Sequence, residues 1–141
     1  MTPVYQQIRS NLVAIVSLLV ALSTLGYTTW RHQVSEVNRT TREAAFEILR
    51  TAEALQTVVD FAHYEMDKQT GHPINGWEKV LYLRDMATLM PPSVTQRTDE
   101  LHAVWAHDWD DLANDEAATQ RITAAIENLR ADVRAQLVRL R

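Results

Sequence analysis

The residues of this 141-residue chain that could do metal chemistry gather near position 65. His63 and Asp67 are four residues apart, so they would share one face of a helix. Glu65 lies between them, and His72 follows in the adjoining loop. Two imidazoles and two carboxylates can bind zinc if the loop folds back. The same spacing is also typical of ordinary side-chain pairing at a solvated helix end, and we favour that interpretation. We therefore expect no metal and no cofactor.

A second candidate group is the carboxylate of Asp108, which falls in the middle of an apolar helix face. A buried carboxylate must be paired or must change its pKa. The natural partner is an arginine of the helix that follows residue 30. The interpretation that we favour is instead that the end of the domain is open and Asp108 reaches water. The residues of the apolar face are Leu101, Val104, Trp105 and Leu112.

Aromatic side chains supply two candidate interaction surfaces. Phe46 and Tyr64 share a side of one predicted helix, away from its main apolar stripe, and can form a contact surface. A ligand pocket between helices is the other candidate. Its lining would come from Trp77, Tyr82, Trp105 and Trp109.

Patterns of common catalytic sites are missing from the sequence. It has no glycine-rich phosphate loop, no nucleophile elbow, no HExxH motif and no cysteine. The formal net charge of −4 argues against a nucleic-acid partner. Glu127 and Asp132 are interleaved with the arginines at 130, 134, 139 and 141, which is typical of a solvated helix face. We therefore predict that the protein is not an enzyme and does not bind nucleic acid.

The element that must position all these residues begins with the apolar stretch 10–30, which follows a short tail at 1–9. The stretch has no charged residue, and as a helix it would be about 30 Å long, the thickness of a bilayer's hydrocarbon core. Tyr27 and Trp30 stand where an interfacial aromatic belt would lie. A cleaved signal peptide would need a small-x-small site, for which the stretch offers only poor candidates. We predict a transmembrane helix.

After residue 30 the pattern predicts an all-α domain over 31–141. Apolar or small residues recur at steps of three and four as far as Met66, so the membrane helix should continue unbroken. Gly71 and Pro73 should end it.

Three shorter helices should follow, each opened by a capping residue. Asn75 would cap the first, and Ser93 would form a capping box with Gln96 in the second. The segment 114–116 would cap the last. The four predicted helices of the domain are about 31–69, 76–90, 93–113 and 115–140.

The Pro91-Pro92 pair decides how these helices pack. Both prolines lack a donor, and Pro91 excludes Met90 from the α region. We favour a kink there, because the second and third helices laid end to end would match the first in length. The result is an antiparallel three-helix bundle whose C-terminus lies at the end away from the membrane. A full reversal at the prolines would give a four-helix bundle instead.

A short tail, one span and a helix that continues into an antiparallel bundle is a plan similar to the front half of bacterial chemoreceptor sensor domains. Our preferred function is a single-pass membrane-anchored module that binds or scaffolds a partner protein, or pairs with a second copy. The alternative is a sensor-like domain that binds a small ligand between its helices.

The side of the membrane on which 31–141 lies has arguments in both directions. The arginines that follow the span favour the cytoplasm. A short tail, one span and a long polar domain is the usual plan of a signal-anchored protein whose C-terminal domain is translocated. We favour the outside, which is the periplasm in a bacterium.

Overall fold

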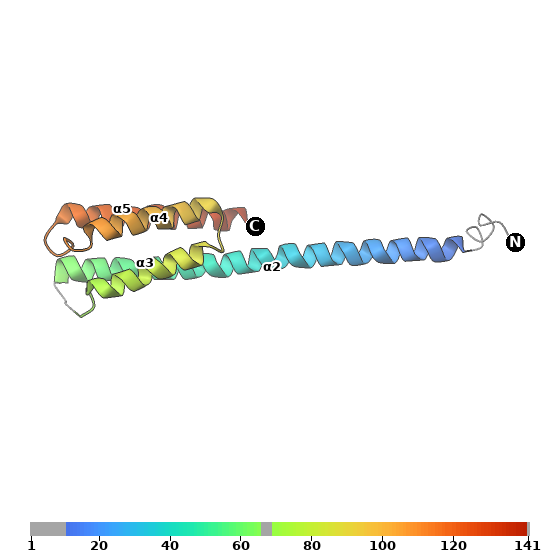
Figure 1. Cartoon of the computed structure of the whole chain (residues 1–141), viewed down its shortest axis with the longest axis horizontal. Helices are drawn as coiled ribbons and strands as arrows, with labels where there is room; N and C mark the ends of the chain where they lie inside the picture. The colour runs from blue at the N-terminus through green and yellow to red at the C-terminus, as the bar shows by residue number, and fades with distance from the viewer. Residues whose placement is uncertain (1–10, 66–68, 141) are drawn as a thin grey trace. The chain divides into compact units, whose positions relative to one another are not determined.

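A computed structural model describes residues 11–65 and 69–140 of the chain. The regular secondary structure of this part is all helical, with no strand, so the predicted all-α class is confirmed there. The chain divides into two compact units, Met1–Asn38 and Arg39–Arg141, which are described in turn. The elements are α2 (Leu12–Asp60), the π-helical turn η1 (Phe61–Glu65), α3 (Pro73–Ala87), α4 (Pro92–Asp108) and α5 (Glu116–Arg139) (Figure 1).

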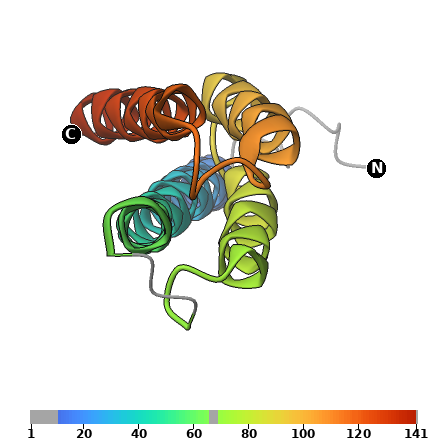
Figure 2. The same cartoon turned by 90° about the vertical axis from the view of Figure 1, so that its left-hand side faces the viewer.

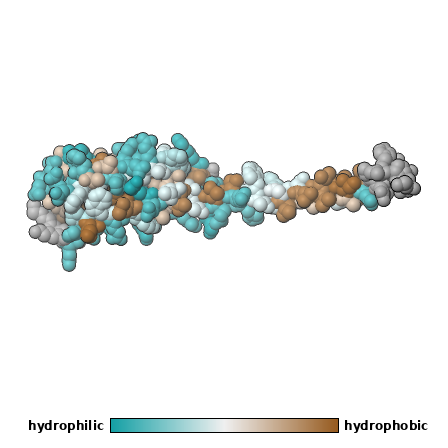
Figure 3. All heavy atoms as spheres, in the orientation of Figure 1, coloured by the Kyte–Doolittle hydropathy of each residue, from teal (hydrophilic) through white to brown (hydrophobic). Residues whose placement is uncertain are grey.

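The described part of the first unit is the N-terminal part of α2. It is long and apolar enough to cross a membrane, and none of its most apolar stretch is buried. Figure 3 shows this stretch as hydrophobic surface. The hydroxyls of Thr24, Thr28 and Thr29 donate to backbone carbonyls three or four residues earlier. These hydroxyls are therefore satisfied inside the helix and do not count against an apolar surrounding.

In the second unit the chain reverses at Pro91-Pro92, so the expected kink is wrong. The hydroxyl of Thr95 donates to the carbonyl of Ala87 at 3.0 Å. Arg84 of α3 pairs with Asp99 of α4 at 3.0 Å. One continuous helix would hold positions 84 and 99 about 22 Å apart. The helix α4 therefore lies back along α3 (Figure 1).

The reversal has a local cause in the residues before the prolines. The helix α3 ends at Ala87, and the next three amides each bond to the carbonyl three residues earlier. That is the tight pattern of a 3₁₀ turn. Pro91 then has φ −57° and ψ 152°, and α4 begins at Pro92, a position where a helix needs no donor. Residues 88–91 thus complete the turn, and no straight continuation remains.

The helices of the second unit run in alternating directions (Figure 1), and Figure 2 shows them nearly end-on in the order α2, α3, α4, α5. Two contacts fix which ends meet. Nδ1 of His63 lies 2.9 Å from the carbonyl oxygen of Leu112, just before α5. At the other end of α5, the guanidinium of Arg42 donates to the carbonyl of Leu140. The C-terminal end of α5 therefore lies beside Arg42, not at the opposite end as we expected.

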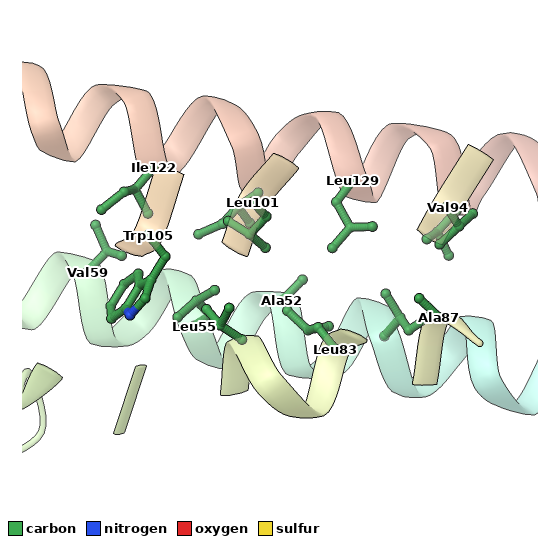
Figure 4. Close-up of a cluster of buried hydrophobic side chains, with 14 of the residues drawn as sticks. Ala52, Leu55, Val59, Leu83, Ala87, Val94, Leu101, Trp105, Ile122 and Leu129 are labelled. Atoms are coloured by element: carbon green, nitrogen blue, oxygen red, sulfur yellow. The ribbon is translucent and has the colours of Figure 1, made fainter. Parts of the chain in front are cut away.

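All four helices contribute to the core of the second unit (Figure 4). The apolar stripe of α2 divides at Thr41. On the N-terminal side of Thr41, Val34 and Val37 are 45% and 64% exposed. On the C-terminal side of Thr41, the other helices of the second unit cover the stripe. The largest fully buried side chains of the unit include Ile48, Leu55, Leu83, Leu101, Trp105, Ile122, Ile126 and Leu129.

The cap of α3 differs from the expected one. The helix begins at Pro73, and Nδ1 of His72 accepts from the amide of Ile74 at 3.2 Å. Asn75 lies inside the helix instead, and its amide donates to the carbonyls of Gln69 and Thr70. Asn75 thus holds the loop against the helix rather than opening the helix.

The cap predicted for α4 is wrong, and the cap predicted for α5 is confirmed. Pro91 occupies the N-cap of α4 and supplies no side-chain bond. Ser93 accepts from Gln136 of α5 at 3.1 Å, so it joins two helices instead of capping one. Asp115 caps α5 as expected, because its carboxylate accepts from the amide of Ala117 at 2.9 Å.

Candidate functional site

Asp108 lies at the end of α4 and is 2% exposed, so it does not reach water as an open end would allow. Its partner is Arg121 of α5, not an arginine of α2. Nε and Nη2 of Arg121 donate to the two carboxylate oxygens at 2.9 and 2.7 Å. Nδ1 of His107 lies 2.7 Å from Oδ1. Burial of Asp108 and its pairing with an arginine are therefore confirmed, whereas the expected partner on α2 and the open end of the domain are wrong.

The hydrogen bonds from Arg121 are the main reason why the pKa of Asp108 falls to about 2, while burial acts in the opposite direction. A carboxylate with that pKa keeps its charge at neutral pH. It is poorly matched to proton transfer, which is fastest when the pKa lies near the working pH. The pair therefore ties α4 to α5.

The residues of the zinc hypothesis make structural contacts where they are described. His63 bonds to Leu112, and its ring lies edge-on to that of Tyr64 at 4.7 Å. His72 caps α3. Asp67 lies outside the described residues. Within residues 11–65 and 69–140, no group of three or more histidines and carboxylates could hold a metal ion.

Trp105 fills the core at the level of Gly76. Its side chain is fully buried, and its ring meets that of Trp77 edge-on with centroids 6.4 Å apart. A Cβ on Gly76 would lie 2.1 Å from two ring carbons of Trp105, so only glycine fits at that position. Trp109 packs against the same core. Gly76 was not among the predicted site residues, although a glycine inside a predicted helix is a signal of close packing.

A groove of about 720 Å³ runs between α2 and α3. Of the four aromatic residues predicted to line a pocket, Tyr82 is the one that lines this groove. The hydroxyl of Tyr82 donates to Glu47 at 3.3 Å, and Arg50 pairs with the same carboxylate at 2.7 Å. Partial burial, followed by the charge of Glu47, raises the pKa of Tyr82. The lining consists of Arg50, Thr51, Ala54, Glu78, Lys79, Leu81, Tyr82 and Asp85.

Beside this groove, α3 carries apolar side chains on its solvent side, where Figure 3 shows hydrophobic patches. Ile74 and Leu81 are 68% and 47% exposed, and Tyr82 and Leu89 are 39% and 47% exposed. The members of each pair are seven residues apart, so Ile74, Leu81 and Tyr82 lie on one side of the helix, and Leu89 follows in the turn after Ala87. The opposite side already supplies the core with Val80, Leu83 and Ala87. We call Ile74, Leu81, Tyr82 and Leu89 the α3 outer face.

Phe46 and Tyr64 are 63% and 71% exposed, but they lie at different places on the second unit. Eighteen residues separate them, or about 27 Å of helix. Phe46 lines a groove of about 400 Å³ between α2 and α5 with Arg42, Leu137 and Val138. A contact surface that includes both aromatic residues would therefore have to extend over this length of the helix.

Comparison of the chain with protein-family models, curated proteins and solved structures found no match. In the structure the α3 outer face lies beside the groove between α2 and α3, whose lining carries both positive and negative charges. Such a surface is suited to binding, since apolar area provides affinity and the charges provide orientation.

Proposed function

We propose that this protein is a single-pass membrane-anchored module whose helical domain binds a partner protein and catalyses no reaction. The observation that carries the proposal is the α3 outer face, which leaves large apolar side chains in water on a unit with a well-filled core. Contiguous exposed apolar patches on soluble domains commonly mark interaction sites. The partner fitted to this face is an amphipathic helix that places apolar side chains on Leu81 and Tyr82. Its basic side chains would pair with Glu78 and Asp85.

The proposed architecture is a membrane helix at 10–30 that leads into an antiparallel four-helix bundle over 39–141. Support for the span is the absence of charge from this stretch and the absence of buried residues from its most apolar part. Support for the bundle is the set of contacts that join α2 to α3 and α5, and α4 to both of its neighbours. Exposed leucines and valines at this density are stable in lipid and costly in water.

Leu18→Arg should remove the protein from the alkali-resistant membrane fraction, because a charge at mid-membrane costs roughly 3 kcal/mol on insertion scales. Leu19→Arg should act in the same way. Val37→Arg is the matched control, since Val37 is exposed but lies beyond the proposed span. Fractionation of membranes, followed by immunoblotting, measures the outcome. Normal retention of the Leu18→Arg variant would contradict a span at this position.

We place residues 31–141 on the outer side of the membrane, which is the periplasmic side in a bacterium. The chain has no cysteine, so a single cysteine at exposed Ala124 can be labelled without background. It should react with a membrane-impermeant maleimide before the inner membrane is opened. Reaction only after lysis would put the domain in the cytoplasm.

A photo-crosslinking amino acid at Leu81 should yield an adduct with a defined second protein in membranes. The same reagent at exposed Ala124, on α5, should yield much less, because Ala124 lies outside the α3 outer face. A second copy of the chain is the alternative partner, and the exposed Val34 and Val37 favour it. A crosslinker at Val37 that gives a product of twice the chain's mass, with no adduct from Leu81, would support the homodimer and contradict the proposal.

A sensor-like domain that binds a small ligand between helices is the second candidate function. The observation that favours it is the groove between α2 and α3, with Tyr82 in its wall. A ligand bound there would protect Tyr82 and change its fluorescence. A peptide helix would in addition protect Ile74 and Leu89 from hydrogen exchange or side-chain labelling, so the extent of the footprint distinguishes the two candidates.

A further inference from the structure

The two ends of the second unit differ in the charged side chains that they carry. The contact of Arg42 with Leu140 marks one end, and the contact of His63 with Leu112 marks the other. We call the first the basic end; its arginines are Arg39, Arg42, Arg134 and Arg139, with Glu43 among them. Two further carboxylates near this end, Glu47 and Asp132, are paired with Arg50 and Arg97. We call the second the acidic end; its carboxylates are Asp60, Asp110, Asp111, Asp115 and Glu116, and Arg121 there is engaged by Asp108.

Apolar side chains accompany the arginines at the basic end. Phe46 and Val138 are each 63% exposed and, with Arg42, line the groove between α2 and α5. Leu89, in the turn before Pro91, is 47% exposed. Arginine beside exposed aromatic and aliphatic side chains is the composition of surfaces that lie on lipid headgroups.

The number of residues between the proposed span and the basic end limits how far apart the two can lie. Arg39 follows Trp30 by nine residues. That interval is about 14 Å long as a helix, and at most about 32 Å when fully extended. An arginine side chain extends several ångströms further, and electrostatic attraction acts over a Debye length of about 8 Å at physiological salt. The arginines of the basic end are thus within range of a charged membrane surface.

We propose that the basic end docks on the anionic headgroups of the membrane that holds residues 10–30, and that the acidic end faces away. This inference rests on the anchoring proposed above. The guanidinium groups bind headgroup phosphates, for which their planar set of donors is well matched. Phe46, Val138 and Leu89 lie at the level of the headgroups. Repulsion of the acidic end from the same surface fixes the direction of the domain.

The test uses the full chain in lipid nanodiscs. One variant carries an environment-sensitive fluorophore on Ala135→Cys near the basic end, and the matched variant carries it on Ala117→Cys near the acidic end. Both alanines are exposed on α5. In discs with anionic phosphatidylglycerol, emission from position 135 should be at least twofold higher than in phosphatidylcholine discs. Emission from position 117 should not change, and about 0.5 M salt should remove the difference, because salt screens these charges.

Removing the charges supplies the second part of the test. With the fluorophore at position 135, Arg134→Gln combined with Arg139→Gln should abolish most of the lipid-dependent rise. Asn114→Asp combined with Ala117→Glu changes the net charge by the same amount at the acidic end and should leave the rise intact. Equal emission in both lipids, or a rise that survives loss of both arginines, would overturn the docking. Failure of the chain to enter discs at all would instead overturn the anchoring, and the docking with it.

Discussion

Arg121→Met should lower the free energy of unfolding by about 3 kcal/mol at pH 7, because it leaves the buried carboxylate of Asp108 without its charged partner. Asp108 is 2% exposed, and two of its hydrogen bonds come from this guanidinium. Methionine keeps much of the volume and apolar contact of the arginine stem, so the loss reports the charge rather than a cavity. Urea denaturation, followed by circular dichroism, measures it.

The double-mutant cycle is the control. Asp108→Asn alone should cost less, since Arg121 is half exposed and can be solvated by water. Adding Asp108→Asn to Arg121→Met should recover part of the lost stability. A double variant that loses the sum of the two single effects would contradict a direct interaction between these side chains.

The pH dependence gives the pair an independent signature. Because the folded-state pKa of Asp108 is lowered from 3.8 to about 2, the stabilisation is complete above about pH 4 and is lost as the pH falls through 2. Its size is about 1–2 kcal/mol once screening at the half-exposed Arg121 is allowed for. The stability difference between the wild type and Arg121→Met should therefore shrink below pH 4. A difference that does not vary with pH would indicate lost packing alone.

Leu129→Ala and Leu55→Ala should each destabilise the domain by about 3 kcal/mol, as truncations of buried leucines do. Both side chains are fully buried in the core of the second unit, Leu55 on α2 and Leu129 on α5 (Figure 4). Each truncation removes apolar contacts from both helices and leaves a cavity that packed neighbours fill only in part. Chemical denaturation measures the change.

Leu81→Ala is the matched control for these core variants. Leu81 is 47% exposed on the α3 outer face, so its truncation leaves no enclosed cavity and should cost well under about 1 kcal/mol. Losses below about 0.5 kcal/mol at both Leu129 and Leu55 would show that these helices do not pack on one another as described.

Several features of the protein follow from the sequence alone, because their causes are local. The stripe of α5 is an example: Ile122, Ile126 and Leu129 are all fully buried, as their spacing of three and four predicts. The cap at Asp115 needs only the neighbouring amides. The exposed apolar stretch at the start of α2 needs only composition and length.

The candidate site could be predicted only in part. The sequence shows apolar residues on more than one side of the α3 segment, and it identifies Tyr82 as a candidate lining residue of a pocket between helices. It cannot show which side the other helices cover, so Leu81 and Leu89 could not be separated from Leu83 in advance. Periodicity determines that a helix has an apolar face, and the packing partners determine which apolar residues are left over.

Only the tertiary structure decided the remaining features, since each depends on residues far apart in the chain. Pro91-Pro92 ends a helix in either topology, and the pairing of Arg84 with Asp99 belongs to the reversal. That reversal brings the C-terminal end of α5 to Arg42 and so creates the basic end. The same reversal brings Arg121 to Asp108. The direction in which a helix returns depends on which buried faces fit together, and no local sequence signal carries that information.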